Sequence, residues 1–330
     1  MADLQKGKTR INCIVSCLLL VACVAVALAF HVISKRQEEV LRIASNVWSG
    51  YETLYLARSL GYYEDKNIRL VELPSNSQVS QSLRNGVIEA ACLTLDEALS
   101  LMQDGVDLRV VLVMDISHGA DVVMARPEIG TLQALRGKRI GVENAAVGAT
   151  MLDAALVAGE LLAEDVTIVP VTVDEHVDAY RAGRIDAVVT FEPVRSKLLQ
   201  EGARVLFDSS QVPGRIVDVL VVRPEVAVAH AKALRELLKG HFRAREYLAS
   251  QPQDAAKRMA PRLGENALEQ FVGLSLPDIQ ENQVLLGGNP PGLRSNAGAL
   301  ADLMLRRKLL QKPVSVERLA DPSFLVGEKE

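Results

Sequence analysis

The chain has 330 residues, of which 49% are hydrophobic and 24% are charged, and its formal net charge is −4. This is the composition of a globular protein with enough chain for two compact lobes. Basic residues are not in excess and aromatic residues make up only 4%, which argues against a nucleic-acid partner.

Residues 1–37 have the pattern of an export signal or a membrane anchor. A basic start precedes an apolar run over residues 11–33, and two more basic residues follow it. Three outcomes fit this pattern: lipidation of Cys23 in a lipobox-like Leu-Val-Ala-Cys sequence, cleavage near Ala29 after an Ala-x-Ala site, or retention as an anchor long enough to span a bilayer. We therefore expect the remaining chain in the periplasm or at the outer face of the cytoplasmic membrane, either membrane-anchored or released.

Cysteine usage predicts no disulfide, metal site or cofactor in the folded part of the chain. Cys92 is the one cysteine beyond the N-terminal segment, so no second cysteine is there to pair with it. It lies in the apolar sequence EAACLT, where we expect an inert core residue. No Cys/His cluster has the spacing of metal ligands.

The sequence after residue 40 predicts a strand, a loop, a helix and a second strand. The strands are expected at 42–46 and 68–73, and the helix is expected to end at Gly61, a typical C-cap residue. The loop before this helix holds Trp48, the one tryptophan of the chain. Ligands of open parallel sheets bind beyond the carboxyl ends of strands, next to helix N-termini. We therefore interpret this loop as part of a binding site.

The rest of the chain contains an internal repeat. The sequence RNGVIEAACLT at 84–94 resembles RAGRIDAVVTF at 181–191, and the elements around the two sequences also correspond. Each half is predicted to have the order β-α-β-α-β-α-β. Such alternation implies a parallel sheet with helices on both faces.

Two further predicted strands are displaced from these sets. Residues 121–126 follow the first set, and residues 218–223 follow the second. If each strand completes the other half's sheet, the chain crosses between the halves twice, near 117–120 and near 209–217. The predicted fold class is therefore α/β, with two doubly wound lobes around a cleft. Lobe 1 is expected to comprise 38–117 and 216–330, including helices after Ala229, and lobe 2 to comprise 118–215.

Several motifs resemble the solute-binding proteins of nitrate/sulfonate/taurine-type ABC importers. They are the W-x-G-Y-E-x-L-Y-L-A-R sequence that starts at Trp48, Leu135–Val142, Thr190–Pro193 and Ala320–Phe324. The resemblance implies the fold of type II periplasmic binding proteins, a small-molecule solute held between the lobes, and ABC permease and ATPase subunits as partners. It does not identify the ligand.

No enzymatic activity is expected. The related thiamine-precursor enzymes of fungi carry a cysteine-rich motif that this chain lacks. The chain also has no G-x-S-x-G, H-E-x-x-H, P-loop or G-x-G-x-x-G motif. We therefore expect a binding protein.

Polar and small residues that follow the predicted strands are the ligand-binding candidates. They are Trp48, Tyr51, Glu52, Asn76, Ser77, Thr94, Asp96, Asn144, Ala146, Gly148, Thr150, Glu192 and Asp218. Many also have a structural explanation. Trp48 could be a core residue, and 144–150 could be a tight turn. Glu52, Asn76, Ser77 and Asp96 could be N-terminal residues of helices, and two of these helices are expected at 78–84 and 97–102. Asp218 differs, because a carboxylate in an interior strand is costly without a partner. Glu192 is the favoured candidate in lobe 2.

The candidates include four carboxylates but no lysine or arginine. A ligand with an amine or amidine suits such a site, and a zwitterion such as taurine could use both the carboxylates and the helix N-termini. We expect the capture of a sulfonate, a taurine-like zwitterion or an amine/amidine precursor for delivery to an ABC permease. The alternative is a membrane-anchored periplasmic ligand sensor that acts through a partner protein.

Overall fold

The computed structural model describes residues 40–64 and 67–325. Within these residues, the strands form one mixed sheet of six strands and one of five. The predicted export or anchor segment, with Cys23 and Ala29, lies outside the described residues. No helix of the described part is both long and apolar enough to cross a membrane. From Leu41 onward, the described chain belongs to one compact unit.

The six-stranded sheet has the order β11-β4-β10-β3-β1-β2 in the described chain. Its strands are β1 (Leu41–Ser45), β2 (Ile68–Glu72), β3 (Ala90–Thr94), β4 (Arg109–Ser117), β10 (Val217–Val222) and β11 (Leu274–Ser275). β1 pairs in parallel with β2 and β3, whereas β10 lies antiparallel between β3 and β4.

The five-stranded sheet has the order β7-β6-β8-β5-β9 within the described residues. Its strands are β5 (Val122–Ala125), β6 (Arg139–Val142), β7 (Thr167–Pro170), β8 (Ala187–Thr190) and β9 (Arg204–Asp208). β6 pairs in parallel with β7 and β8, whereas β5 lies antiparallel between β8 and β9.

Each displaced strand joins the sheet of the other half, as the sequence predicts. β5 follows the first set but pairs with β8 and β9, and β10 follows the second set but pairs with β3 and β4. The two resulting connections contact each other through the hydroxyl groups of Ser117 and Ser209, which are 2.7 Å apart. We keep the names lobe 1 and lobe 2 for the residue groups defined above.

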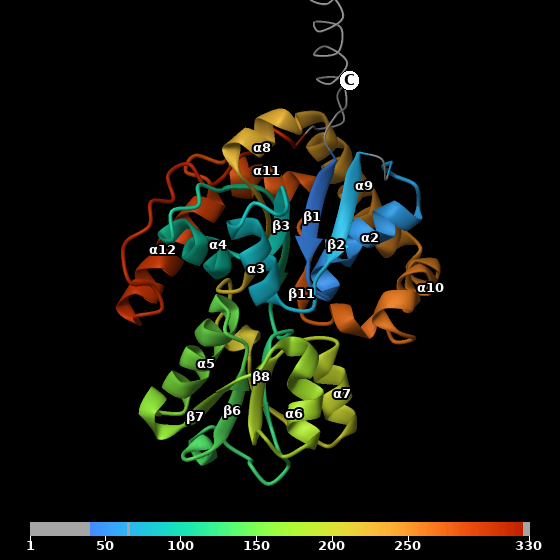
Figure 1. Cartoon of the computed structure of the whole chain (residues 1–330). Coiled ribbons are helices and arrows are strands. Elements are labelled where there is room, and N and C mark those ends of the chain that lie inside the picture. Colours follow the sequence, from blue (N-terminus) through green and yellow to red (C-terminus); the bar gives the residue numbers. More distant parts are fainter. Residues whose placement is uncertain (1–39, 65–66, 326–330) are drawn as a thin grey trace, which may run out of the picture. The chain divides into compact units, whose positions relative to one another are not determined.

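Helices cover both faces of the six-stranded sheet (Figure 1). α2 (Glu52–Ser59) and α9 (Ala231–Ser250) pack on one face, and α3 (Asn76–Arg84), α4 (Leu95–Gln103) and α12 (Gly292–Arg306) pack on the other. α9 approaches α2 closely at Gly240, where a Cβ atom would lie 3.5 Å from the Ala57 Cβ. The residues after Ala229 are thus helical and pack against the first helix of the six-stranded sheet.

The remaining helices extend both lobes. α8 (Pro224–Ala229), α10 (Pro252–Leu263) and α11 (Ile279–Gly287) belong to lobe 1. α5 (Ala146–Ala158), α6 (His176–Arg181) and α7 (Val194–Gln200) accompany the five-stranded sheet in lobe 2 (Figure 1).

The starts of two helices differ from the sequence prediction. α3 begins at Asn76 rather than at residue 78, because Ser75 is its N-cap and accepts a hydrogen bond from the Gln78 amide. α4 begins at Leu95 rather than at residue 97, because Thr94 and Glu97 form a capping box around its first turn. Cys92 is buried and free in β3, as expected.

Strand β10 shows why the carboxylate of Asp218 is unusual. All six residues of VDVLVV are buried, as in a central strand covered on both faces. Five of them are apolar, and Asp218 interrupts this run at its second position. Burying a carboxylate without a cationic partner costs free energy, and Asp218 lies at the edge of the sheet where the candidate site is found.

Candidate functional site

Two adjoining hollows are present, the first lined by residues of both lobes and the second by residues of lobe 2. They share Asp121, Val147 and Phe191. The first hollow is otherwise lined by Asn46, Trp48, Tyr51, Asn76, Thr94 and Asp218. The second hollow is otherwise lined by Glu143, Gly148, Met151, His176, Val189 and Thr190.

Strand direction brings these side chains together. Asn46 follows β1 and Thr94 ends β3, so both lie at the carboxyl edge of the six-stranded sheet. The antiparallel strand β10 begins at this edge and places Asp218 opposite Thr94. In the five-stranded sheet, Glu143 follows β6 and Phe191 follows β8, at the corresponding edge. Ligands of doubly wound sheets bind at edges of this kind.

A buried pair of aspartates lies at the first hollow, with Asp218 in its lining and Asp115 behind Asp218. Asp115 on β4 and Asp218 on β10 are direct partners in the strand register. Trp48 Nε1 donates to Asp115 Oδ2 over 3.1 Å, and the Tyr51 hydroxyl donates to Asp218 Oδ1. The second oxygens, Asp115 Oδ1 and Asp218 Oδ2, have no hydrogen-bond partner among the described residues.

Burial shapes the ionisation of this pair. It raises the pKa of Asp115 to about 8, although the Trp48 hydrogen bond acts in the opposite direction. Burial and the charge of Asp115 raise the pKa of Asp218 well above its usual range. Both pKa values rise because burial removes water from the carboxylate and no cation replaces it, so the charged form is disfavoured.

Gly50 allows the Trp48 loop to lie against this pair. A Cβ atom at Gly50 would lie 1.7 Å from Asp115 Oδ2 and 2.6 Å from Trp48 Nε1. Any side chain at this position would displace the Trp48–Asp115 hydrogen bond. The glycine of the W-x-G motif is therefore required for the close packing of the Trp48 loop against Asp115.

Asp121 adds a third aspartate, from the connection between the lobes. It lines both hollows, is 4% exposed, and its Oδ2 has no hydrogen-bond partner within the described residues. Burial raises its pKa to about 7, although Ser117 acts in the opposite direction.

Two acidic residues of α4 lie behind the lining. The Thr94 hydroxyl donates to Asp96 Oδ1 over 2.5 Å, and the Thr94 amide donates to Glu97 Oε2 over 3.2 Å. Burial raises the pKa of Asp96, against the effect of the Thr150 and Thr94 hydroxyls. Burial, followed by the charges of Asp96 and Glu143, raises the pKa of Glu97 to about 8.

Glu143 of lobe 2 occupies the N-terminus of α3 in lobe 1. Its Oε1 accepts from the Ser77 amide over 2.8 Å and from the Ser77 hydroxyl over 2.7 Å. A carboxylate of the protein therefore holds the position at Ser77 where the helix N-terminus favours an anion.

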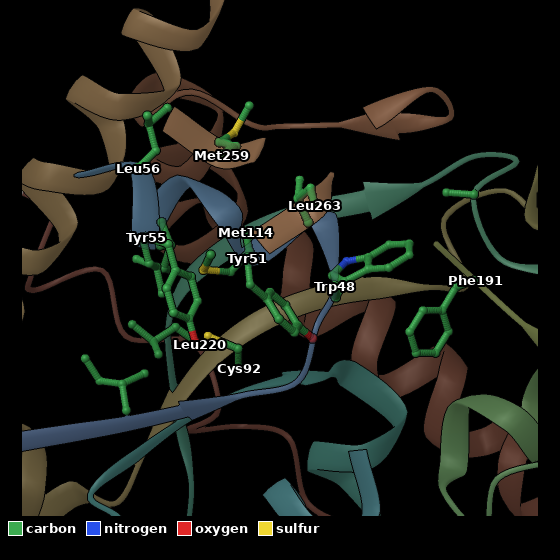
Figure 2. Packing of buried hydrophobic residues seen from close by; sticks show 14 of the residues in the cluster. Trp48, Tyr51, Tyr55, Leu56, Cys92, Met114, Phe191, Leu220, Met259 and Leu263 are labelled. Atoms are coloured by element: carbon green, nitrogen blue, oxygen red, sulfur yellow. The ribbon is translucent and has the colours of Figure 1, made fainter. Parts of the chain in front are cut away.

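Aromatic rings from the two lobes meet at the first hollow. The centroids of Trp48 and Phe191 are 5.2 Å apart, and the rings form an edge-to-face pair at 83°. Figure 2 shows the Phe191 ring beside the Trp48 indole, with Tyr51 close to Trp48. These rings provide an apolar wall for part of a ligand.

His176 brings no positive charge to the second hollow. Its Nδ1 lies 3.1 Å from the Thr190 hydroxyl, and its Nε2 lies 3.1 Å from the Val171 carbonyl oxygen. Burial lowers its pKa to about 4, so the ring is neutral at physiological pH. No group of three or more His, Cys, Asp or Glu side chains in the described ranges is arranged to hold a metal ion.

Comparison with known protein families shows which family this chain belongs to. Residues 34–264 match the model of the NMT1-like family, which is more than half of the chain. The chain belongs to the NMT1-like family. Membership of this family agrees with the expected resemblance to the solute-binding proteins of ABC importers.

Individual relatives are similar to most of this NMT1-like chain. A protein of Escherichia coli (strain K12), named as an aliphatic sulfonates-binding protein, is 25% identical over 316 residues, which cover 91% of this chain and 94% of the relative. The alkanesulfonate-binding protein SsuA from Xanthomonas axonopodis pv. citri, solved with MOPS bound, has a TM-score of 0.70 at 21% identity, over 84% of this chain and 96% of that one. The desulfurization enzyme DSZB has the same fold, with a TM-score of 0.62 at 19% identity over 87% and 97% of the two chains.

The structure brings some of the predicted site residues to the hollows. Those that line them are Trp48, Tyr51, Asn76, Thr94, Gly148 and Asp218. Those that do not line them are Glu52, Ser77, Asp96, Asn144, Ala146, Thr150 and Glu192. Asn144 is exposed, whereas Thr150 is buried against the acidic residues of α4.

Two predicted carboxylates pair with arginines that are not among the candidate residues. Glu52 accepts from Arg262 Nε over 2.9 Å, and Arg262 lies over the Tyr55 ring at 3.3 Å from its centroid. Burial raises the pKa of Glu52 to about 7 in spite of Arg262. Glu192 accepts from Arg195 Nη1 over 3.0 Å and from the Ser196 amide over 3.1 Å.

Sequence reasoning missed several lining or supporting residues. They include Asn46, Asp115, Asp121, Glu143, Val147 and Phe191. The signal that identified Asp218 was also present for Asp115, because Asp115 interrupts the apolar strand sequence RVVLVMDIS. Phe191 directly precedes Glu192, so the predicted turn was correct but the neighbouring side chain faces the hollow.

Proposed function

We propose that this protein is an extracytoplasmic solute-binding protein that captures a small polar organic solute between lobe 1 and lobe 2. In this proposal, lobe 1 comprises 38–117 and 216–330, and lobe 2 comprises 118–215. The observation that carries the proposal is the hollow whose lining comes from both lobes, with Trp48 and Asp218 on one side and Val147 and Phe191 on the other. A solute held there contacts both lobes at once, as closure around a ligand requires.

The relatives support solute capture and delivery. The names of both the E. coli relative and the Xanthomonas protein refer to sulfonate binding, and the latter was solved with MOPS, which carries a sulfonate and a tertiary amine. By analogy, this protein delivers its solute to the permease of an ABC importer that is driven by ATPase subunits. A sulfonate, a taurine-like zwitterion and an amine or amidine precursor are the solute classes under consideration.

The N-terminal segment supports a location outside the cytoplasm. Residues 1–37 are proposed to direct export and then to anchor the protein, either as a retained span or through lipidated Cys23. Cleavage near Ala29 would release it instead. The mass of the N-terminal peptide of the protein isolated from membranes distinguishes these outcomes.

Solute capture is tested with protein stripped of ligand by denaturation and refolding. It is titrated with the low-mass fraction of a cell extract, and the fluorescence of Trp48 is recorded. We expect a saturable change that is lost when Phe191→Ala removes the opposing ring. An extract that produces no saturable change in the refolded protein, at any concentration, contradicts solute capture.

Delivery is tested by cross-linking in intact membranes. We expect peptides of a transporter permease to be cross-linked to either lobe. Cross-links to a signalling protein in place of a permease would support the sensor alternative.

A further inference from the structure

We propose that the captured solute is a cation, with an amine or amidine group held by Asp218 and Asp121, and that the site rejects sulfonates that carry no such group. This inference rests on the proposed function, because it assigns the charge of the solute that the two-lobed hollow takes. It departs from the sulfonates named for the relatives.

The first support is an excess of carboxylates with free oxygens. Asp121 and Asp218 both line the first hollow, and they are 4% and 2% exposed. The Oδ2 atom of each has no hydrogen-bond partner in the part of the chain that the structure describes. Two buried carboxyl groups that line the hollow and each keep an unpaired oxygen can accept hydrogen bonds from N–H donors of a ligand.

The second support is the absence of a compensating cation at the lining. Among the described residues, neither hollow is lined by lysine or arginine. His176 is held neutral by burial. Glu143 adds another carboxylate to the second hollow. An anionic solute would therefore find no cationic side chain at the lining, whereas a bound cation would favour the ionised form of these carboxyl groups and offset the cost of their desolvation.

The third support is that a carboxylate of the protein already occupies the N-terminus of α3. This nine-residue helix presents its first amide groups toward lobe 2, where an anion would be stabilised by hydrogen bonds and the helix dipole. Glu143 already accepts from both the amide and the hydroxyl of Ser77. A sulfonate would have to displace this carboxylate, which is covalently part of the opposing lobe.

The aromatic rings complete the proposed recognition. Trp48 and Tyr51 lie beside the aspartates because they donate hydrogen bonds to Asp115 and Asp218. Phe191 faces Trp48 from lobe 2. A cation next to these rings gains cation–π attraction, and the rings bury the apolar part of the same molecule.

The test uses probes that differ in charge but share one carbon skeleton. One set is benzamidine, benzamide and benzenesulfonate, and a second is butylamine, butyramide and butanesulfonate. Their effect on the unfolding temperature of the ligand-free full chain is measured at about pH 8, near the raised pKa of Asp115. We expect the cation of at least one set to stabilise the protein and its sulfonate not to do so.

Other outcomes separate the inference from the proposed function. If a sulfonate or an amide stabilises the protein and its matching cation does not, the inference is wrong and solute binding stands. If no probe stabilises the protein and the extract titration is also negative, the proposed function fails and the inference fails with it.

Variants locate the cation. Asp218→Asn and Asp121→Asn each remove one charge without changing side-chain shape, and each should weaken binding of the stabilising cation about 10- to 100-fold, the scale of a charge-assisted hydrogen bond. Asp107→Asn is the matched control, because Asp107 is an exposed partner of Arg109 far from the lining. Unchanged affinity in both Asp121→Asn and Asp218→Asn would place the cation elsewhere and overturn the inference.

Discussion

Asp115 and Asp218 face each other as register partners on the neighbouring antiparallel strands β4 and β10, at the edge of the six-stranded sheet that meets lobe 2. Each carboxyl group receives one hydrogen bond from the Trp48 loop, from the indole in one case and from Tyr51 in the other. The displaced strand creates this pair, because β10 enters the sheet in the direction that brings Asp218 to the carboxyl ends of its neighbours. The exchange of strands between the two sheets is thus what brings the two carboxyl groups together at the site.

The aspartates should make the ligand-free protein less stable as pH rises. The pKa values of Asp115 and Asp121 are raised to about 8 and about 7, above their values in an unfolded chain. The folded state therefore binds more protons than the unfolded state between about pH 4 and pH 8, and the free energy of unfolding falls through that window. Each extra proton contributes a slope of about 1.4 kcal/mol per pH unit.

Urea unfolding at several pH values checks this prediction, with Asp115→Asn as the test variant and Asp107→Asn as the control. We expect a shallower pH dependence in Asp115→Asn. At high pH this variant should be more stable than the parent by about 1–3 kcal/mol, the cost of an unsatisfied buried polar group. Parallel profiles for the parent and Asp115→Asn would show that this carboxyl does not titrate in the folded state as described.

Binding of a cation should release protons. The titratable groups that line the hollows are Asp121, Asp218, Glu143, Tyr51 and His176, with Asp115, Asp96 and Glu97 behind them. A bound cation favours ionised carboxylates, so affinity should rise between about pH 6 and pH 8. Calorimetry of benzamidine binding in two buffers with different ionisation enthalpies measures the number of protons released. Proton uptake would indicate that the carboxyl groups act as donors to a ligand of another kind.

Removal of the Glu143 carboxylate should create affinity for sulfonates. Glu143→Ala frees the amide and hydroxyl groups of Ser77 at the N-terminus of α3. We expect methanesulfonate to raise the unfolding temperature of Glu143→Ala but not that of the parent. Glu143→Gln is the matched variant, because it removes the charge and keeps an acceptor in place, so it should gain less. Equal responses of the parent and both variants would exclude this helix terminus as an anion site.

A side chain at Gly50 should disrupt the packing of the Trp48 loop against Asp115. The Cβ atom of Gly50→Ala would overlap the Asp115 carboxylate and crowd the Trp48 indole. We expect a loss of about 2 kcal/mol or more in unfolding free energy, as for overpacking of a buried site, together with a shifted emission of Trp48. Gly130→Ala is the control, because an added Cβ there meets no atom within 4 Å. Similar stability for the two variants would contradict the close approach of the Trp48 loop to Asp115.

Much of the fold could be predicted because it rests on local pattern. The repeat of turn and strand around Gly86 and Gly183 defined the two halves, and the unplaced strands at 121–126 and 218–223 predicted the exchange between sheets. Asp218 was predictable for a similar reason, since a carboxylate within an apolar strand is an anomaly in sequence alone.

The contacts between distant elements could not be predicted in this way. Arg262 reaches Glu52 from 210 residues along the chain, and Glu143 reaches Ser77 across the two lobes. No short sequence pattern predicts either contact, because each depends on how the helices and sheets pack against one another. The Arg195–Glu192 pair is different, since its i,i+3 spacing at the start of α7 was visible in the sequence.

The charge of the natural solute tests the central claim most directly. The protein is purified from its native cells without denaturation, and the small molecule it carries is released and identified by mass spectrometry. The acidic hollow predicts a solute with an amine or amidine group, present in the parent and depleted in Asp218→Asn. A bound sulfonate that lacks any amino group, retained equally by both proteins, would contradict the account.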